Sequence, residues 1–86
     1  MLIQPPGRCL IGKDGTITER KHCHPPLGLA YLAAAAREAG YLVDVLDMLA
    51  EGYNQERYTE QFVYYGLGVE EALSRIEVAD PDLIGI

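Results

Sequence analysis

The feature that most constrains the fold is a helix with two clear ends that leads directly into a short apolar segment. Residues 24–47 read HPPLGLAYLAAAAREAGYLVDVLD. Pro26 suits the first turn of a helix, where no backbone donor is needed, and Gly40 is a natural helix stop. The expected buried stripe recurs at helical spacing, at Leu29, Leu32, Ala33 and Ala36. The sequence therefore predicts a helix between Pro26 and Gly40, followed by a strand over residues 41–47.

The rest of the chain supplies two more strands and one more helix. Residues 1–4 form a short apolar run, which Pro5 and Pro6 end. Residues 69–79 have an inner stripe at helical spacing, at Val69, Ala72, Leu73 and Ile76. Residues 83–86, LIGI, are typical of a buried parallel strand. The order strand–helix–strand–helix–strand predicts right-handed crossovers and a parallel sheet, the pattern of an α/β fold.

Asp44 indicates the order of the strands. A central strand of a parallel sheet is a nearly continuous apolar run, but Asp44 interrupts residues 41–47, so this strand is expected at an edge. An outermost second strand favours a flavodoxin-like (Rossmann-like) parallel sheet over the dinucleotide-binding order. Three strands and two helices make only half of such a doubly wound domain. We therefore expect residues 1–86 to be a piece of a longer protein, or a chain whose remaining strands come from elsewhere.

Residues 7–25 show no sustained period and are expected to be a loop or a hairpin insertion. Within them, Cys9–Ile11 and Thr16–Thr18 are able to pair across a turn at Asp14 and Gly15. A connection of this length is usually functional or disordered.

Residues 48–68 are polar and rich in tyrosine, and no regular element is predicted in them. QFVYY, residues 61–65, reads as a poor central strand. Tyr64 and Tyr65 are expected to stack on the edge of the sheet, and packing beneath a cofactor or a partner is the alternative.

Composition and charge exclude several classes of function. At 86 residues the chain suggests at most one small domain. Its net charge of −6 argues against binding to a nucleic-acid backbone. No apolar run approaches the roughly 18 residues that a membrane span needs, and the N-terminus lacks the features of a signal peptide. A cytoplasmic protein with no nucleic-acid or membrane partner is therefore expected.

Two stretches resemble one family of proteins. PPLGLAYLAAAAREAGYLVDVLDM, residues 25–48, resembles the start of the cobalamin-binding domain found N-terminal to many radical S-adenosylmethionine (radical SAM) enzymes. YYGLGVEEALSRIEVADPDLIGI, residues 64–86, is similar to the second helix and third strand of that domain, and QPP at residues 4–6 matches its first strand and double proline. The resemblance implies a flavodoxin-like fold, with residues 1–86 as the N-terminal part of a cobalamin-binding-like domain. It also implies a parent enzyme of the methyltransferase, methylthiotransferase or oxidative cyclase type.

The resemblance also implies that a corrinoid lies at the carboxyl ends of the parallel strands, where open α/β sheets bind ligands. In this sequence the start of the first helix is expected to face the same edge. A glycine there lets a flat ligand approach the backbone closely. The candidate cofactor-binding residues are Gln4, Pro5, Pro6, His24, Leu27, Gly28 and Asp47.

The sequence departs from the family in two places. Cobalamin domains carry Asp-x-His-x-x-Gly before this helix, and the histidine is the lower cobalt ligand. If Gly28 is that glycine, Pro25 occupies the histidine position, Cys23 occupies the aspartate position, and His24 is one residue off. The Cys-x-x-x-Cys-x-x-Cys motif of the iron–sulfur cluster is also absent. The 4Fe-4S cluster and S-adenosylmethionine would therefore bind only in another part of the parent chain.

Three other motifs have a functional and a simpler interpretation. His22–His24, with a cysteine between, could supply zinc ligands, but three adjacent residues rarely converge on one ion, and a solvated loop is preferred. GLGVEEA, residues 66–72, is similar to a dinucleotide-binding turn, yet Glu71 in its sixth position fits poorly against phosphate. Asp47 lacks the acidic pair that a phosphoacceptor needs, so capping of a turn is preferred. No metal site and no catalytic set are predicted.

Two functions follow from these expectations. In the first, the chain holds a corrinoid over the catalytic barrel of a radical SAM parent enzyme, and the catalytic residues lie outside residues 1–86. In the second, the chain is a non-catalytic α/β docking or oligomerisation module that no longer binds cobalamin. In either case the unpaired sheet edge at residues 83–86 predicts that the isolated segment self-associates.

Overall fold

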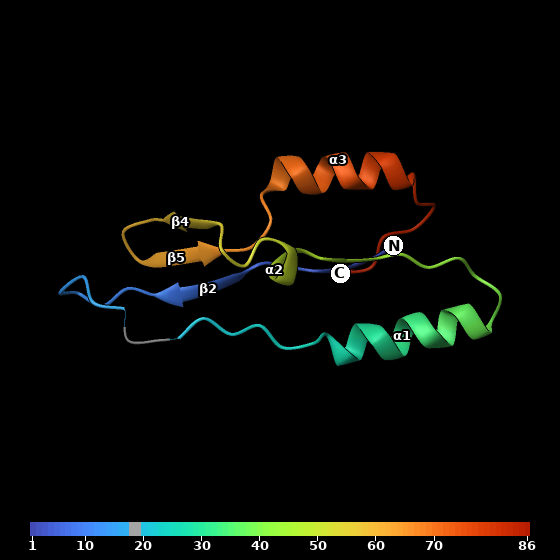
Figure 1. Ribbon diagram of the computed structural model, residues 1–86, viewed down its shortest axis with the longest axis horizontal. Helices are drawn as coiled ribbons and strands as arrows, with labels where there is room; N and C mark the ends of the chain where they lie inside the picture. Colours follow the sequence, from blue (N-terminus) through green and yellow to red (C-terminus); the bar gives the residue numbers. More distant parts are fainter. Residues whose placement is uncertain (18–19) are drawn as a thin grey trace.

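The computed structural model describes residues 1–17 and 20–86 (Figure 1). In chain order the elements are β1 Leu2–Gln4, β2 Gly7–Leu10, α1 Leu27–Glu38, β3 Val45–Asp47, α2 Met48–Glu51, β4 Glu56–Tyr58, β5 Phe62–Tyr65 and α3 Val69–Ala79. The strands form two sheets, β1–β3 and β2–β5–β4. Because these sheets lie end to end, the molecule is elongated, and its radius of gyration of 15.2 Å exceeds the about 12 Å of a compact chain of this length.

Parallel pairing between distant parts of the chain builds the first sheet. β1 and β3 run in the same direction, with Gln4 opposite Asp47. On the other side of β1, Gly85 forms a parallel bridge with Leu2, supported by two backbone hydrogen bonds of 2.8 and 2.9 Å. Among the described residues β3 pairs with β1 alone. The parallel arrangement is therefore confirmed, and β3 lies at the edge that Asp44 predicts.

Helices cover both faces of this parallel sheet (Figure 1). α1 lies against β1 on one side, and α3 packs on the other. Right-handed crossovers require this arrangement, because the chain first moves from β1 to one neighbour and then returns past β1 to the other. The core joins α3 to the sheet and consists of Ile3, Leu46, Met48, Leu67 and Ala72. No helix in the described part of the chain has the length and apolar character to cross a membrane.

The two ends of α1 are as the sequence predicts, whereas its inward face is less buried than predicted. Pro26 is the N-cap residue, and Gly40, with a φ of +97°, ends the helix. The Tyr41 N–H then donates to the Ala36 carbonyl (3.0 Å), which is the backbone pattern of a glycine-terminated helix. Leu29, Ala33 and Ala36 of the predicted stripe are half-buried and face inward, but no residue of α1 is fully buried, and Leu32 is 59% exposed. Strands of three residues cover too little of a twelve-residue helix to bury its side chains.

Three other predictions in this half need correction. In α3, Ala72 is buried as predicted, but Val69 and Leu73 are exposed. The strand predicted over residues 41–47 forms only at Val45–Asp47. Residues 83–86 lie beside β1 as predicted, yet they are not a buried strand, and Ile86 is 86% exposed. These side chains are exposed because β1 is the only strand that pairs with them among the described residues.

A second, antiparallel sheet is the main feature that the sequence does not predict. β2 pairs with β5, with Gly7 opposite Tyr65, and β4 pairs with the other side of β5. β5 is therefore the central strand, and the interpretation of QFVYY as a poor central strand is wrong. Tyr65 is buried rather than stacked on an edge. The residues of β5 alternate between half-buried and buried, which suits an antiparallel sheet with one solvated face.

The hairpin predicted within residues 7–25 is present in a shorter form. Ile11 and Ile17 form an antiparallel bridge around a turn that contains Gly15. In the turn, the Asp14 carboxylate accepts hydrogen bonds from the N–H and the hydroxyl of Thr16, and these bonds lower the pKa of Asp14. Residue 18, the end of the predicted pairing, lies outside the described residues. Residues 7–10 belong instead to the larger antiparallel sheet.

A junction of two glycines joins the two sheets. The Leu67 N–H donates to the Met48 carbonyl (2.7 Å), which brings residues 66–67 against α2. A Cβ on Gly52 would lie 2.1 Å from the Leu67 nitrogen, and one on Gly66 would lie 2.5 Å from the Pro6 Cβ. Neighbouring atoms therefore occupy the space that any side chain at these two positions would need.

Candidate cofactor-binding site

The carboxyl ends of β1 and β3 lie side by side and form the edge at which the sequence predicts a ligand. The parallel register places Gln4 opposite Asp47, so two of the seven predicted residues are brought together. The start of α1 and the carboxyl ends of these strands lie at the same end of the parallel sheet (Figure 1). We call this region the carboxyl edge; it comprises Gln4–Pro6, Asp47 and the start of α1 at Leu27–Gly28.

Asp47 has a structural task at this edge. It is the N-cap residue of α2, and its carboxylate accepts a hydrogen bond from the Ala50 N–H (3.0 Å). Aspartate is favoured at this position because it satisfies a backbone donor that the helix cannot satisfy itself. The preference for Asp47 as a cap is thus confirmed.

Pro5 and Pro6 end β1 and lead the chain into β2. Pro5 is exposed, whereas Pro6 is half-buried and lies against Gly66 in the junction between the sheets. Proline has no N–H and so cannot extend the pairing of β1 with its neighbours. The two residues form one wall of the carboxyl edge, and Pro5 is the one that faces solvent.

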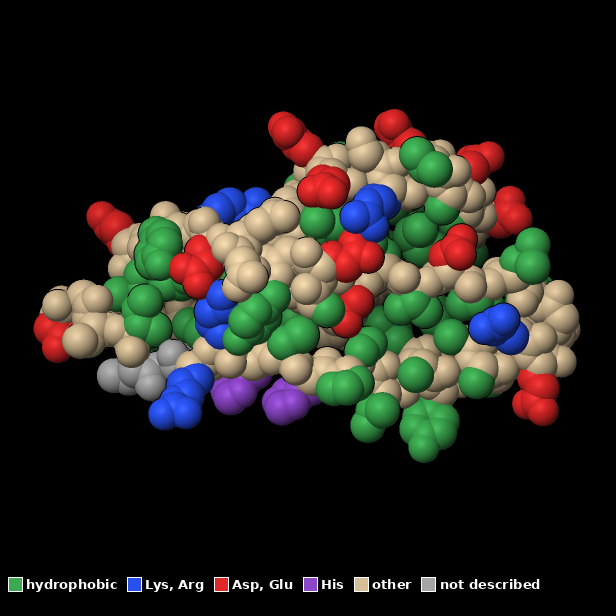
Figure 2. Space-filling view, in the orientation of Figure 1, with side chains coloured by type: hydrophobic (Ala, Val, Ile, Leu, Met, Phe, Trp, Pro, Cys, Tyr) green, Lys and Arg blue, Asp and Glu red, His purple; other side chains and the backbone are tan. Residues whose placement is uncertain are grey.

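The start of α1 is open and apolar. Leu27 is 66% exposed, and a Cβ built on Gly28 meets no atom within 4 Å. The first turn of the helix has no side-chain cap and no acidic residue. Figure 2 shows hydrophobic side chains over the surface of α1 that faces away from the sheet. A flat apolar group can therefore approach the helix backbone at Gly28 without displacing any described side chain.

No contact among the described residues directs the His24 side chain toward β1 or β3. Its ring stacks on that of His22, with 5.7 Å between the centroids and 15° between the planes, and both residues are exposed. Cys23 between them is an exposed free thiol. Within residues 1–17 and 20–86, no three His, Cys, Asp or Glu side chains form a group suited to a metal ion.

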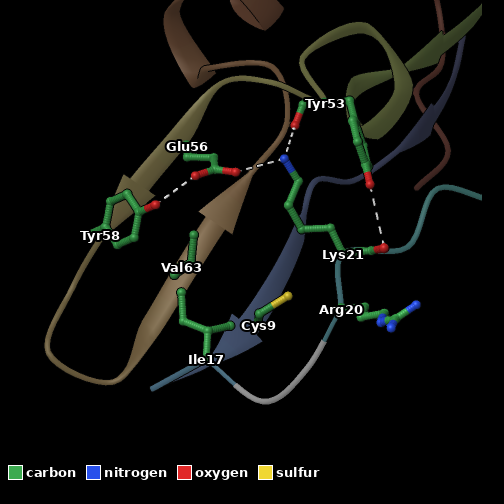
Figure 3. A pocket seen from close by; sticks show the side chains of 8 residues that line it. All are labelled: Cys9, Ile17, Arg20, Lys21, Tyr53, Glu56, Tyr58 and Val63. Atoms are coloured by element: carbon green, nitrogen blue, oxygen red, sulfur yellow. Dashed lines mark hydrogen bonds and ion pairs between the residues drawn. The ribbon is translucent and has the colours of Figure 1, made fainter. Parts of the chain in front are cut away.

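A cavity of about 460 Å³ lies over the antiparallel sheet, away from the carboxyl edge (Figure 3). Its lining includes Cys9 and Val63 from the sheet, Ile17 from the hairpin and the charged pair Lys21 and Glu56. The cavity has apolar side chains at its base and polar side chains at its rim.

Lys21 is the centre of the polar contacts in this cavity. Its ammonium donates to the Tyr53 carbonyl (2.6 Å) and to the Glu56 carboxylate (2.8 Å), which in turn accepts from the Tyr58 hydroxyl (2.7 Å). The Lys21 hydrogen bond, followed by that of Tyr58, lowers the pKa of Glu56, and the Glu56 carboxylate raises the pKa of Lys21. The same ammonium lies 4.2 Å from the centroid of the Tyr53 ring and 5.3 Å from that of Tyr65.

The sequence did contain a signal for this second region. Phe62–Tyr65 are four residues of high β-propensity, and Glu56–Tyr58 precede them at the spacing of a hairpin. The sequence gives no local signal for the contacts of Lys21, because Lys21 and Glu56 are separated by 35 positions. Only the assembled sheet brings them together.

A family model for the B12 binding domain matches residues 14–86. The chain belongs to the B12 binding domain family. The match includes both helices of the parallel half, the carboxyl edge at Asp47 and the strand segment at residues 83–86. A flavodoxin-like fold with a parallel sheet is thereby supported for this B12 binding domain.

A curated relative agrees with this assignment. Cytidylyl-2-hydroxyethylphosphonate methyltransferase from Streptomyces wedmorensis is 39% identical over 67 residues, which is 74% of this chain. The matched region is only 12% of the length of that relative. No solved structure matches this B12 binding domain.

The start of α1 leaves open space for a flat macrocycle at the carboxyl edge. The open backbone at Gly28 and the exposed Leu27 suit a flat, largely apolar macrocycle. If Gly28 is the glycine of the motif, Pro25 occupies its histidine position, and His24 is stacked on His22 in the preceding loop. On that correspondence the described part of this B12 binding domain offers packing surfaces and backbone groups at the edge, and its histidines lie elsewhere.

Proposed function

We propose that residues 1–86 hold cobalamin at the carboxyl edge and belong to a radical SAM enzyme of the methyltransferase type. Membership of the B12 binding domain family supports the cofactor, and the methyltransferase name of the relative supports the class of reaction. The 4Fe-4S cluster, S-adenosylmethionine and the catalytic barrel would be supplied elsewhere in the parent chain.

The parallel register of β1 and β3 is the observation that carries this proposal. It places Gln4 beside Asp47 at one edge, and the open start of α1 belongs to the same end of the sheet. Ligands of open α/β sheets bind in this position because the loops there are free to diverge around them. An antiparallel arrangement of these strands would have removed the edge.

Five residues of the carboxyl edge have a proposed role. Leu27 and the backbone at Gly28 pack against the face of the macrocycle, and Pro5 closes one side. The Gln4 side chain offers an amide to the polar groups at the rim. Asp47 holds the start of α2 in place through its cap. Cobalamin, when bound, supplies a cobalt centre that is able to carry a methyl group.

A bulky side chain at Gly28 tests the proposal. In the full chain that carries residues 1–86, Gly28→Trp is expected to weaken hydroxocobalamin binding by about tenfold or more, because the indole would occupy the open space above the helix. The measurement is titration followed by the visible spectrum of the corrinoid. Ala34→Trp is the matched control, since Ala34 is exposed on the same helix but lies well beyond its first turn.

Two results would contradict the proposal. The first is unchanged affinity in Gly28→Trp, which would place the corrinoid elsewhere. The second is a wild-type chain that shows no spectral shift and retains no corrinoid on purification, which would favour a docking or oligomerisation module instead.

The proposal extends to the isolated segment. Leu83 and Ile86 are 81% and 86% exposed beside β1, and α1 is apolar on its outer face. We expect residues 1–86 alone to self-associate through these surfaces. Sedimentation at several concentrations measures this, and a monomer at every concentration would contradict it.

A further inference from the structure

We propose that Lys21 is a positioning residue for the carboxyl edge, acting through the segment that leads into α1. This segment, residues 20–26, is called the strap. The antiparallel sheet holds the strap at its beginning, and the strap delivers Leu27 and Gly28 to the carboxyl edge. The inference rests on the proposed cobalamin site and gives the second sheet a role in building it.

The first tie between the strap and the sheet is the ammonium of Lys21. It bonds the Tyr53 carbonyl just before β4 and the Glu56 carboxylate within β4, at 2.6 and 2.8 Å. The Lys21 side chain is only 22% exposed, because it lies between the rings of Tyr53 and Tyr65. Charge-assisted bonds in a partly buried setting are stronger than those of a solvated surface pair. Figure 3 shows Lys21 reaching from the strap to these partners.

The second tie is the hydroxyl of Tyr65 in the central strand. It accepts a hydrogen bond from the His22 N–H (3.1 Å), so two consecutive residues of the strap are held. The ring of Tyr65 reaches the strap by lying across Gly7, where a Cβ would stand 2.7 Å from the ring. The pairing of Gly7 with Tyr65 in the antiparallel sheet thus has a direct consequence for the strap.

The remaining residues of the strap are able to transmit this position to α1. Only four residues separate His22 from Leu27, and two of them are Pro25 and Pro26, whose φ angles are fixed by their rings. Pro26 is also the N-cap residue of α1, and the Pro25 carbonyl accepts a hydrogen bond from the Leu27 N–H (2.8 Å). Fixing Lys21 and His22 therefore limits where Leu27 and Gly28 lie.

The test compares three substitutions in the full chain. Lys21→Met keeps the apolar stem and removes the ammonium, and Tyr65→Phe keeps the ring and removes the hydroxyl. Lys13→Met is the matched control, because Lys13 is exposed at the hairpin and makes no hydrogen bond or ion pair with the described residues. The second substitution keeps the test decisive if the first variant does not fold.

Two readouts are measured for each variant. Hydrogen exchange of the His22 amide, without corrinoid, is expected to rise about tenfold in Lys21→Met and Tyr65→Phe, the effect of losing one strong hydrogen bond. The dissociation constant for hydroxocobalamin is expected to rise about fivefold, because a smaller fraction of molecules holds α1 in the competent position. Lys13→Met is expected to leave both values unchanged.

The readouts separate failure of this inference from failure of the proposed function. Unchanged exchange of the His22 amide in both variants would overturn the tie itself. Faster exchange with an unchanged dissociation constant would overturn the positioning role. If the wild-type chain binds no hydroxocobalamin, the proposed function fails and the positioning role fails with it, while the exchange data still decide whether Lys21 holds the strap.

Discussion

The two halves of the molecule differ in how many large apolar side chains they leave exposed. In the parallel half, α1 and residues 83–86 leave large apolar side chains exposed, among them Tyr31 at 77% and Leu83 at 81%. In the antiparallel half, Cys9, Val63 and Tyr65 are buried, Lys21 of the strap bonds Glu56 of β4, and Tyr58 is the most exposed of the large apolar side chains. Most of the exposed large apolar side chains lie in the parallel half, which therefore presents surface suited to further partners.

The two halves also differ in what they offer a ligand. The parallel half has an open backbone at Gly28 and an apolar surface, which suits a large flat cofactor. The antiparallel half has a cavity of about 460 Å³, in which Lys21 and Tyr58 both bond the Glu56 carboxylate. This difference is the reason that we propose binding at the carboxyl edge and a supporting role for the antiparallel sheet.

The largest expected effect comes from breaking the junction that both halves share. Gly52→Ala is expected to lower the free energy of unfolding by about 3 kcal/mol or more, because its Cβ would lie 2.1 Å from the Leu67 backbone nitrogen. Chemical denaturation measures this. Gly28→Ala is the matched control, and its open surroundings predict no loss. Equal stability of the two variants would show that the halves do not depend on this contact.

A smaller effect is expected from the cap at the carboxyl edge. Asp47→Ala removes the hydrogen bond to the Ala50 N–H and is expected to cost about 1 kcal/mol of stability, whereas Asp47→Asn keeps a cap and costs less. Thermal unfolding separates the two. If Asp47→Asn retains stability yet loses hydroxocobalamin affinity, Asp47 contacts the cofactor and is not only a cap.

The smallest expected effect is a pH dependence confined to the antiparallel half. Lys21 lowers the pKa of Glu56 from its ordinary 4.5, so the pair stabilises the fold above pH 4.5, and this contribution is lost as the pH falls through the lowered pKa. The pKa of Lys21 is raised above 10.5 by Glu56, so the pair persists below pH 10.5 and is lost only as the pH rises through the raised value. The carboxyl NMR shift of Glu56 measures the lower limit.

The variant Lys21→Met is the reference for the NMR titration of Glu56. In Lys21→Met the midpoint for Glu56 is expected to move upward, toward 4.5, because the largest cause of the lowered pKa is removed. An identical midpoint in the wild type and the variant would contradict the ion pair in solution.

Local signals explain why the parallel half was largely predictable. Pro26, Gly40 and Asp44 each act within their own segment, so the ends of α1 and the edge position of β3 follow from the sequence. The exposure of Leu32 could not be predicted, because helical spacing shows which positions share a face and not what lies against that face.

The antiparallel half was missed because its pairing is long-range. Gly7 faces Tyr65 across almost sixty intervening positions, and nothing in GRCL indicates this partner. QFVYY is the central strand of an antiparallel sheet, in which one face can be solvated, so a continuous apolar run is not needed. The carboxyl edge was predicted from the parallel topology, whereas the contacts of Lys21 depend on a sheet that was not predicted.

The most direct test of the account is the location of the corrin ring in a structure of the full chain loaded with hydroxocobalamin. The account predicts the ring over the carboxyl ends of β1 and β3, against Leu27 and Gly28. A ring seated over the antiparallel sheet, or on any surface away from Gln4 and Gly28, would contradict it.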